Sequence, residues 1–290
     1  MPFTHTRNFR IRYYECDANG HLNNANYLRF MQETATDAST AGGYGEKKYT
    51  EMNRYWLIFA SQVEYLLPAF TNDTLQVKTW VTDFRRASSR RSYEFTRLET
   101  NEPIARAYTD WIFLNASNHQ PSTIPAELKE AFFPEGLPES FPPRQPFPKA
   151  PPPPPGVYKM RLHVAWQDID TMQHVNNAIY LNYISECGFQ AVAAHNWSWE
   201  RMKEEGFAIF LRRMQIQYLG QAKLGDELEI ATWVSDVKRS TAMRHYTITR
   251  ITDGAVLTRA HTLGVWVDLA TMRPVRIPTK MLEDFSTNIV

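Results

Sequence analysis

The chain repeats itself at one constant offset of 153 residues. The segment CDANGHLNNANYLRFMQE at 16–33 aligns without a gap with IDTMQHVNNAIYLNYISE at 169–186, and the same register persists as far as Pro125 and Pro278. A period this long exceeds that of solenoid units and is typical of two copies of one globular domain. The length of 290 residues, about twice that of a common domain, agrees with two copies.

A proline-rich segment separates the two copies. Residues 134–155 hold eleven of the eighteen prolines, and five of them follow one another from Pro151 to Pro155. Proline fixes φ and removes a backbone donor, so this segment is predicted to be an extended, semi-rigid linker that enters neither core. We therefore assign residues 1–133 to domain 1, residues 134–155 to the linker and residues 156–290 to domain 2.

Each copy predicts the same order of secondary structure. Apolar and polar residues alternate at 9–14 and at 162–167, which indicates an opening strand that continues through Tyr13 and Trp166. Apolar or small residues then recur with helical spacing, which predicts long helices over 24–41 and 177–194. They occupy positions 27, 30, 31, 34, 35 and 38, and again 180, 183, 184, 187, 188 and 191. Alternating strands follow, so each domain is predicted to be α+β, with one long helix packed on a curved antiparallel sheet.

Composition excludes several classes of function. The 32 Lys+Arg and 31 Asp+Glu residues give a formal net charge of +1, so no overall field favours nucleic acid. No stretch approaches the roughly 18 apolar residues of a membrane-spanning helix. Two cysteines cannot form a disulfide framework or a four-ligand zinc site, so we expect no metal. The start of the sequence has no signal-peptide pattern, and we expect a cytoplasmic protein.

The repeat also selects a candidate site. Of the eight histidines, only His21 and His174 match each other at the offset, and each follows a matched aspartate, Asp17 or Asp170, by four residues. The pattern D-x-x-x-H-x-N-N lies where the chain enters the long helix. N–H groups and the positive dipole end of a helix suit an oxyanion that forms on a carbonyl. Carboxylate, imidazole and such donors together suffice for acyl transfer to water.

A structural role is the alternative for part of this pattern. Asn23 and Asn176 suit the N-cap position of each helix, and the aspartates could stabilise the first turn. The cysteines are not part of the repeat. Cys187 falls on the apolar stripe of its helix and is predicted to be a small core residue, whereas Cys16 could be a nucleophile beside His21.

Two basic, hydroxyl-rich segments provide a second candidate site. RRASSRR at 85–91 and KRSTAMR at 238–244 lie where two strands are expected to turn. Arginine with serine or threonine at a turn suits phosphate recognition, although a solvated hairpin has the same composition. The substrate-binding candidates here are Arg86, Ser88, Arg239 and Ser240.

The pattern D-x-x-x-H-x-N-N-x-x-Y at the entry to a long helix resembles the hotdog-fold thioesterases. In copy one, Asp17-Ala18-Asn19-Gly20-His21-Leu22-Asn23-Asn24 is similar to the D-x-N-x-H-V-N-N stretch of plant and bacterial acyl-ACP thioesterases, which contain two hotdog domains. The 4-hydroxybenzoyl-CoA thioesterase family has the same fold. This resemblance implies two tandem hotdog domains that pair as an intrachain pseudo-dimer. The segments at 65–75 and 218–228 resemble the strand that follows the helix in this family.

The resemblance also implies roles for individual residues. An aspartate would attack the thioester or activate water, while histidine and asparagine position the reactants. The catalytic candidates are Asp17, Asn19, His21, Asp170 and His174. The further substrate-binding candidates are Asn24, Asn177, Tyr27, Tyr180 and Gln221. Met172 stands where copy one has Asn19, so copy one is preferred as the active copy. The Glu-Cys pair of the plant enzymes is replaced by Pro68-Ala69 and Gln221-Ala222.

The expected function is hydrolysis of acyl-CoA or acyl-ACP thioesters in fatty acid metabolism. CoA or phosphopantetheine would enter only as part of the substrate, with no other cofactor. An acyl carrier protein is therefore an expected partner, and dimerisation of the two-domain unit stays open. The alternatives are a hotdog enoyl-thioester hydratase or dehydratase and a non-catalytic acyl-thioester binder.

Overall fold

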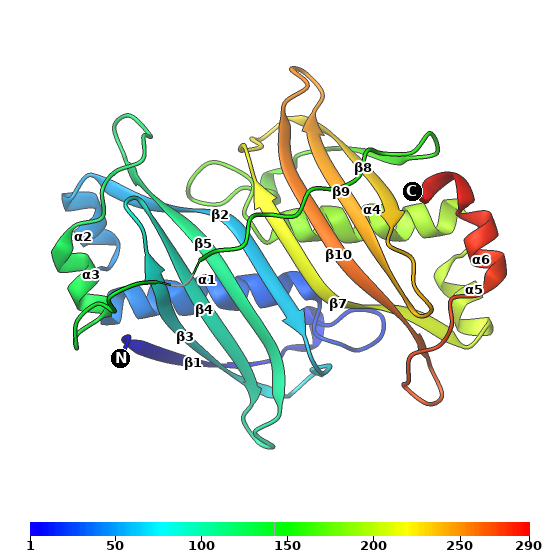
Figure 1. Ribbon diagram of the computed structural model, residues 1–290, viewed down its shortest axis with the longest axis horizontal. Coiled ribbons are helices and arrows are strands. Elements are labelled where there is room, and N and C mark those ends of the chain that lie inside the picture. The colour runs from blue at the N-terminus through cyan, green and yellow to red at the C-terminus, as the bar shows by residue number, and fades with distance from the viewer. Residues whose placement is uncertain (142) are drawn as a thin grey trace. The chain divides into compact units, whose positions relative to one another are not determined.

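The computed structural model describes residues 1–141 and 143–290 and divides the chain into two compact units, Met1–Pro146 and Phe147–Val290 (Figure 1). The division falls inside the proline-rich segment 134–155. The described residues of this segment lie in no helix or strand. Several of them nevertheless contact a unit: Phe141 packs against an apolar cluster of unit 1, and Phe147 lies against His261 in unit 2. The segment is therefore bound along part of its length.

Unit 1 is an antiparallel sheet with one long helix. In chain order the elements are β1 (Thr4–Arg10), η1 (Tyr13–Glu15), α1 (Asn24–Ala41), α2 (Glu46–Glu51), β2 (Arg54–Tyr65), β3 (Thr74–Phe84), β4 (Ser88–Arg97), β5 (Pro103–Asn115) and α3 (Ala126–Phe132). Its strands follow one another across the sheet as β1-β3-β4-β5-β2. The helix contacts β1 and β3, so its apolar face is covered by the sheet.

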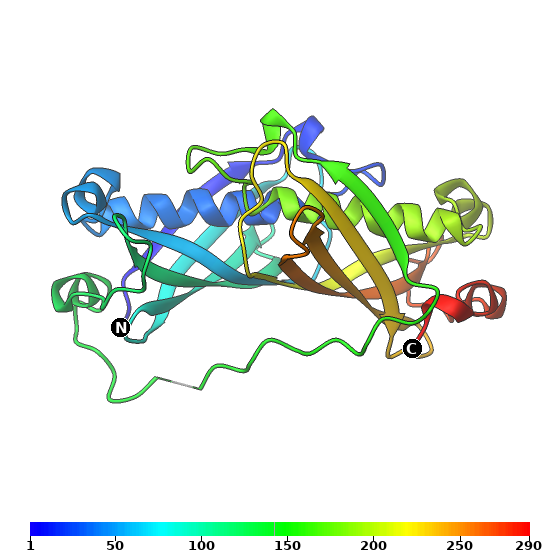
Figure 2. The ribbon, with the colours of Figure 1, turned by 90° about the horizontal axis from the view of Figure 1, so that it is seen from above.

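Unit 2 repeats this plan. Its elements are β6 (Tyr158–His163), η2 (Trp166–Asp168), α4 (Ile179–Ala194), α5 (Trp199–Glu204), β7 (Phe207–Tyr218), β8 (Glu227–Ser235), β9 (Thr241–Arg250), β10 (Val256–Asp268), α6 (Thr279–Asp284) and η3 (Ser286–Asn288). The strand order β6-β8-β9-β10-β7 is that of unit 1. In Figure 2 each long helix lies on one face of the sheet of its own unit. The predicted α+β domain is confirmed in both copies.

The long helices follow their apolar spacing. All six predicted core positions of α1 are buried, and in α4 only Gly188 of the six is partly exposed. Burying a large apolar side chain contributes about 1.5–3 kcal/mol, so this stripe fixes the helix on the sheet. Helix α1 has the predicted bounds, whereas α4 begins two residues later than predicted. The delay arises because the first bonds there, Ile179 N to Asn176 O and Leu181 N to Ala178 O, span three residues instead of four.

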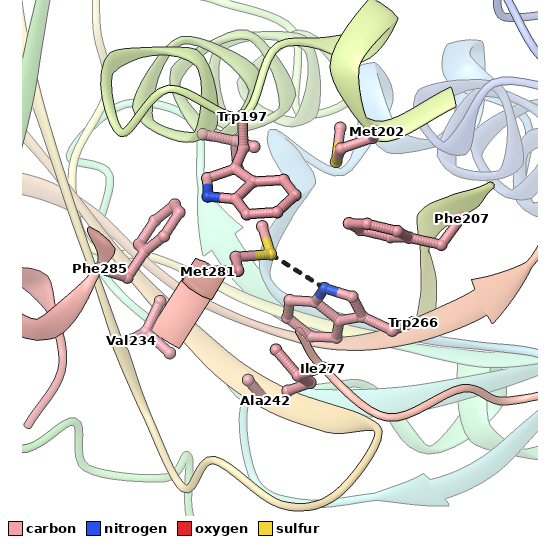
Figure 3. Packing of buried hydrophobic residues seen from close by; sticks show 10 residues of the cluster. Trp197, Met202, Phe207, Val234, Ala242, Trp266, Ile277, Met281 and Phe285 are labelled. Atoms are coloured by element: carbon pink, nitrogen blue, oxygen red, sulfur yellow. Dashed lines mark hydrogen bonds between the residues drawn. The ribbon is translucent and has the colours of Figure 1, made fainter. Parts of the chain in front are cut away.

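A cluster of aromatic and sulfur-containing side chains closes the far end of each long helix. In unit 2 it includes Trp197, Phe207, Trp266 and Met281, and the indole N–H of Trp266 donates to Met281 Sδ at 3.2 Å (Figure 3). The counterpart in unit 1 surrounds Phe113 and includes α3. The short helices that complete these clusters were not predicted, because six or seven residues are too few to show a period.

The predicted opening strands are wrong at their ends. Strand β1 stops at Arg10 and β6 at His163, and a 3₁₀ turn follows each of them. Tyr13 and Trp166, which continue the alternating pattern, are 85% and 76% exposed instead of half-buried. The expected strand at 65–75 is also wrong, because β2 ends at Tyr65 and β3 begins at Thr74. Alternation alone therefore extended two elements into loops.

Candidate active site

In unit 1 the pattern D-x-x-x-H forms a tight turn that Asp17 closes. Asp17 Oδ1 accepts hydrogen bonds from the backbone N–H of Asn19 at 2.8 Å and of His21 at 3.1 Å. The backbone adds Asp17 N to His21 O at 2.8 Å and Gly20 N to Asp17 O at 2.9 Å. One carboxylate oxygen thus fixes the loop. The other oxygen, Oδ2, makes none of these bonds. Because Asp17 is exposed, Oδ2 is accessible to a substrate.

Unit 2 forms the same turn with a different use of the carboxylate. Asp170 Oδ1 accepts from Met172 N at 2.9 Å, and Oδ2 accepts from Asn176 Nδ2 at 3.2 Å. His174 Nδ1 lies 3.8 Å from Asp170 Oδ1 and 3.2 Å from the carbonyl oxygen of Val175. Both oxygens of Asp170 are therefore engaged within the unit.

The two histidines differ in exposure. His21 is half-buried, and its ring lies edge-on to Phe70 with ring centres 5.2 Å apart. Burial lowers the pKa of His21 from its ordinary value of 6.5, while the nearby Asp17 carboxylate raises it. His174 is only 5% exposed, and its Nε2 has no hydrogen-bond partner within the described part of the chain. The two copies thus present one half-buried and one fully buried imidazole.

The buried site of unit 2 contains a second unsatisfied group. Asn177 Nδ2 has no acceptor among the described residues, three positions from the unsatisfied His174 Nε2. The carbonyl of Val175 can only accept, so Nδ1 of a neutral His174 carries the proton and Nε2 is an acceptor. Buried polar groups without partners are rare and costly.

The helix entries supply further donors. Asn23 Oδ1 accepts from Ala25 N at 2.9 Å, and Asn176 Oδ1 accepts from Ala178 N at 3.0 Å. Asn23 is the N-cap of α1, as predicted, whereas Asn176 bonds within the turn that precedes α4, whose N-cap is Ala178. Asn24 N and Asn177 N have no acceptor within residues 1–141 and 143–290. Asn24, the first residue of α1, lies at the positive end of the helix dipole, which stabilises negative charge.

The two tyrosines selected from the repeat are core residues. Tyr27 is 3% exposed and packs against Tyr65 and Phe95, and burial raises its pKa. Tyr180 is 2% exposed, and its hydroxyl accepts from Ala222 N at 3.0 Å. Burial raises the pKa of Tyr180 to about 12. Their repetition reflects the attachment of the helix to the neighbouring loop.

The basic turns lie away from the helix entries of their own units. Arg86 and Ser88 belong to the turn between β3 and β4, where Arg86 O accepts from Ile124 N near α3. The helix entry contacts the loop that precedes the other end of β3, through Leu22 N and Ala69 O. Eleven residues of strand span about 35 Å. Within one unit, the structure therefore does not bring Arg86 to His21. Arg239 and Ser240 occupy the same turn between β8 and β9, with Ile277 N donating to Arg239 O.

The remaining candidates lie at the margin of the helix entries. Gln221 is exposed, and its carbonyl oxygen accepts from Arg250 Nη1 at 3.3 Å. Cys187 is fully buried, as predicted, and burial raises the pKa of its thiol to about 12. Cys187 therefore lacks the lowered thiol pKa that a nucleophilic cysteine requires. Cys16 is partly buried, with Sγ 3.2 Å from Thr71 Oγ1.

One carboxylate near the site was missed. Asp168 is buried, and its Oδ2 accepts from the hydroxyl of Tyr183 at 2.6 Å and from Ala165 N at 3.0 Å. Glu15, its counterpart at the offset of 153, accepts from Arg12 N in the same way. The sequence signal was an acidic residue at both matching positions. One is Glu15 and the other is Asp168, so a comparison of identical residues does not detect the pair. Both acids stabilise the 3₁₀ turn that leads to the site.

Neither a metal cluster nor a membrane-spanning helix is found among the described residues. In residues 1–141 and 143–290, no group of three or more His, Cys, Asp or Glu side chains is arranged to hold a metal ion. Within the same residues, every helix is too short or too polar to cross a membrane.

Comparison with known proteins decides the family. The model of the thioesterase-like superfamily matches residues 11–132 and, a second time, residues 164–285. The chain belongs to the thioesterase-like superfamily. The two matches begin 153 residues apart, which is the offset of the repeat. Each hotdog domain therefore corresponds to one copy.

Named relatives include enzymes with one and with two copies. The chain is 26% identical over 274 residues to the chloroplastic palmitoyl-acyl carrier protein thioesterase of Gossypium hirsutum, an alignment that covers 89% of this chain and 62% of the relative. It is 29% identical over 189 residues to the acyl-[acyl-carrier-protein] hydrolase FATB2 of Cuphea viscosissima, covering 62% of this chain and 46% of that one. The acyl-CoA thioester hydrolase YbgC of Escherichia coli is 24% identical over 129 residues, covering 44% and 96%. The chain thus spans about half to three fifths of the two plant relatives.

Solved structures share the tandem hotdog fold. The 12:0-ACP thioesterase from Umbellularia californica superposes with a TM-score of 0.72 at 19% identity, covering 91% of this chain and 94% of that chain. An acyl-ACP thioesterase from Bacteroides thetaiotaomicron gives a TM-score of 0.70 at 19% identity, covering 90% and 97%. At these identities the likeness establishes the fold.

Proposed function

We propose that this chain hydrolyses acyl thioesters carried by acyl carrier protein or CoA, at the turn that enters a long helix. The observation that carries the proposal is the repeated Asp-His turn at the positive end of α1 and α4, in a member of the thioesterase-like superfamily. The names of its relatives, which describe acyl-ACP and acyl-CoA hydrolysis, support the same reaction.

We propose unit 1 as the principal site. Only unit 1 presents aspartate, asparagine and histidine together, since Met172 replaces the asparagine in unit 2. Asp17 Oδ2 is outside the hydrogen bonds that fix the loop, and Asp17 is exposed, so a substrate can approach it. His21 is half-buried next to Asp17, and its lowered pKa keeps the imidazole neutral near pH 7. A neutral imidazole can accept a proton from water.

The reaction would follow from these groups. Either Asp17 attacks the thioester carbonyl, the C–S bond breaks and water then hydrolyses the acyl–aspartate anhydride, or Asp17 orients a water that attacks the carbonyl directly. In both routes His21 accepts a proton from that water, and the products are the free acid and the thiol. The N–H of Asn24, at the N-terminus of α1, is available for the developing oxyanion. The thiol of CoA or of phosphopantetheine then leaves with a proton.

Thiol release tests the proposal. Ellman's reagent would monitor short, medium, long and aromatic acyl-CoAs and one acyl-ACP, with the wild-type chain and the double variant Asp17→Asn/Asp170→Asn. We expect turnover in the wild type and loss of at least about 100-fold in the double variant, the usual scale of positioned acid–base groups. Full turnover in a folded double variant would refute the Asp-centred mechanism.

The same panel separates the alternatives. A change in enoyl absorbance without thiol release would indicate a hydratase or dehydratase. Tight binding of acyl thioesters with no turnover across the panel would indicate a binding protein. Either result would replace the hydrolase proposal.

A further inference from the structure

The start of the linker is bound to the outer face of the unit 2 sheet. We call Phe147–Pro151 the strap. The ring of Phe147 lies 5.0 Å from that of His261, Pro148 O is 3.0 Å from His261 Nε2, and Trp233 Nε1 donates to Pro151 O at 3.2 Å. In Figure 2 this stretch runs along the face of the unit 2 sheet opposite α4. Five residues of strap are therefore held by two strands, β8 and β10.

A chain of hydrogen bonds continues from the strap into the sheet. His261 Nδ1 is 2.7 Å from His245 Nδ1, and His245 Nε2 is 2.7 Å from Ser235 Oγ. Both histidines are 4% exposed. They stand opposite each other on β9 and β10. We call Ser235, His245 and His261 the relay. Its hydrogen bonds connect these three residues to the strap in a single series.

The geometry fixes the proton positions when both histidines are neutral. A carbonyl oxygen only accepts, so His261 Nε2 carries the proton toward Pro148 and its Nδ1 is bare. His245 Nδ1–H then donates to that bare nitrogen, which leaves His245 Nε2 to accept from the hydroxyl of Ser235. Every polar atom of the relay is satisfied without any buried charge.

Protonation disturbs this arrangement in two steps. A first proton can enter at His245 Nε2, where the Ser235 hydroxyl turns to accept from it, so the bond between the rings is kept but a charge is buried. A second proton places two N–H groups face to face at a separation of 2.7 Å, where they repel. Released from the strap, the rings would regain water and could take up protons freely. The strap is consequently bound best by the neutral pair.

The charged neighbours act in opposite directions. Burial is the largest influence and lowers the pKa of His245 to about 4, with His261 and Arg244 lowering it further and Asp236 raising it. Burial also lowers the pKa of His261, while the Pro148 carbonyl raises it. Two exposed cations lie nearby in the chain: Arg259, two residues before His261 on β10, and Lys149, next to Pro148 in the strap. Neither cation favours protonation of the pair.

At the matching positions of unit 1, all of which the structure describes, the two histidines are absent. Unit 1 has Thr82, Ser92 and Tyr108 in place of Ser235, His245 and His261. The relay is therefore not a requirement of the fold. It belongs to the face of unit 2 that the strap covers.

We propose that Ser235, His245 and His261 form an acid-sensitive latch that holds the strap on unit 2 at neutral pH and releases it on acidification. The released histidines have ordinary pKa values of about 6.5, above the lowered values of the bound pair. The bound state is thus complete above pH 6.5 and weakens as the pH falls toward 4. For each histidine that gains a proton, the docking equilibrium falls by up to about tenfold per pH unit.

The indole N–H of Trp233 reports on the strap because it donates to Pro151. Nitrogen–proton spectra of the full chain would be recorded between pH 7.5 and 4.5, with the Trp233 resonance assigned by Trp233→Phe. We expect this resonance to move as the pH falls below about 6.5. In His261→Gln, whose amide can still donate to Pro148 O but does not titrate, the resonance should keep its neutral-pH position.

His163→Gln is the matched control, because His163 is an exposed histidine of unit 2 at the end of β6. It should titrate as the wild type does. An unchanged Trp233 resonance in a folded wild type down to pH 4.5 would overturn the latch, as would the wild-type transition in His261→Gln. If His261→Gln does not fold, His245→Gln applies the same test to the other ring.

Discussion

The two helix entries have the same backbone and different chemistry. In both, an aspartate accepts the N–H two residues ahead, and an asparagine side chain accepts a second N–H two residues after itself. In unit 1 the carboxylate also binds the N–H of His21, and the imidazole is half-buried. In unit 2 the carboxylate binds Asn176, and the imidazole of His174 is buried with an unsatisfied Nε2.

This difference separates the structural role of the repeated residues from their proposed role in chemistry. The asparagine oxygen and one aspartate oxygen each accept a backbone N–H in both copies, so their repetition is explained by structure. The second oxygen, the exposure of the imidazole and the residue at 19 or 172 differ between the copies. In the mechanism proposed above, those three features favour unit 1 as the copy that acts on a substrate.

The largest expected contrast lies between the two aspartates. Asp17→Asn should lower kcat for thioester hydrolysis by at least about 100-fold, because it removes the accessible carboxylate. Asp170→Asn should cost less than about tenfold. Thiol release from the best acyl-CoA measures both. Equal losses would mean that both units work, and the reverse order would assign the reaction to unit 2.

Restoring the missing asparagine is the next test. In the Asp17→Asn background, Met172→Asn should raise the residual rate by about tenfold, because it adds a third polar group to the unit 2 turn. Met172 is exposed, so the change should leave the core intact. Met272→Asn, at another exposed methionine of unit 2, is the control. No gain would show that burial of His174, and not residue 172, limits unit 2.

The turns should also differ in their tolerance of a side chain. Gly20 has φ +77°, and Gln173 has φ +61° at the same position of unit 2. Gly20→Gln should lower the free energy of unfolding by about 1 kcal/mol, because left-handed backbone strains residues with a Cβ. Gln173→Gly relieves that strain but raises the conformational entropy of the unfolded chain. The two effects oppose each other, so the free energy of unfolding should change by less than about 0.5 kcal/mol. Urea unfolding compares them, and a smaller cost in unit 1 would contradict the argument.

The smallest expected effect concerns pH. If neutral His21 accepts the proton, kcat/KM falls as the pH drops through the lowered pKa of His21, on the acid side of 6.5. Asp17→Asn removes the charge that raises this pKa, so the pKa of His21 should fall further. Imidazole resonances measure it in the folded variant. A rise in that pKa would show that another group dominates.

The residues of the repeat predicted most of the fold. The constant offset identified two copies, and the apolar spacing placed α1 at its observed bounds. The ends of the opening strands were wrong, because Tyr13 and Trp166 continue an alternating pattern although a 3₁₀ turn exposes them. Hydrophobic pattern reports which residues can be buried, whereas backbone hydrogen bonds decide where a strand ends.

The candidate site was predicted in part. Asp17, His21 and their counterparts do share one turn, because four residues separate them in each copy. The distance of Arg86 from this turn was not predicted, because it depends on the length of β3, which places Arg86 at the opposite end of the unit. The relay of Ser235, His245 and His261 had no sequence signal, because these residues come from three strands and are not repeated.

The sequence by itself determined the duplication, the long helix and the turn chemistry at its entry, because these depend on residues close together in the chain. The tertiary structure decided which imidazole is buried, which carboxylate oxygen is accessible and where the strap is bound. Those properties arise from long-range packing and hydrogen bonding between strands, which set the local dielectric and the available partners of each polar group.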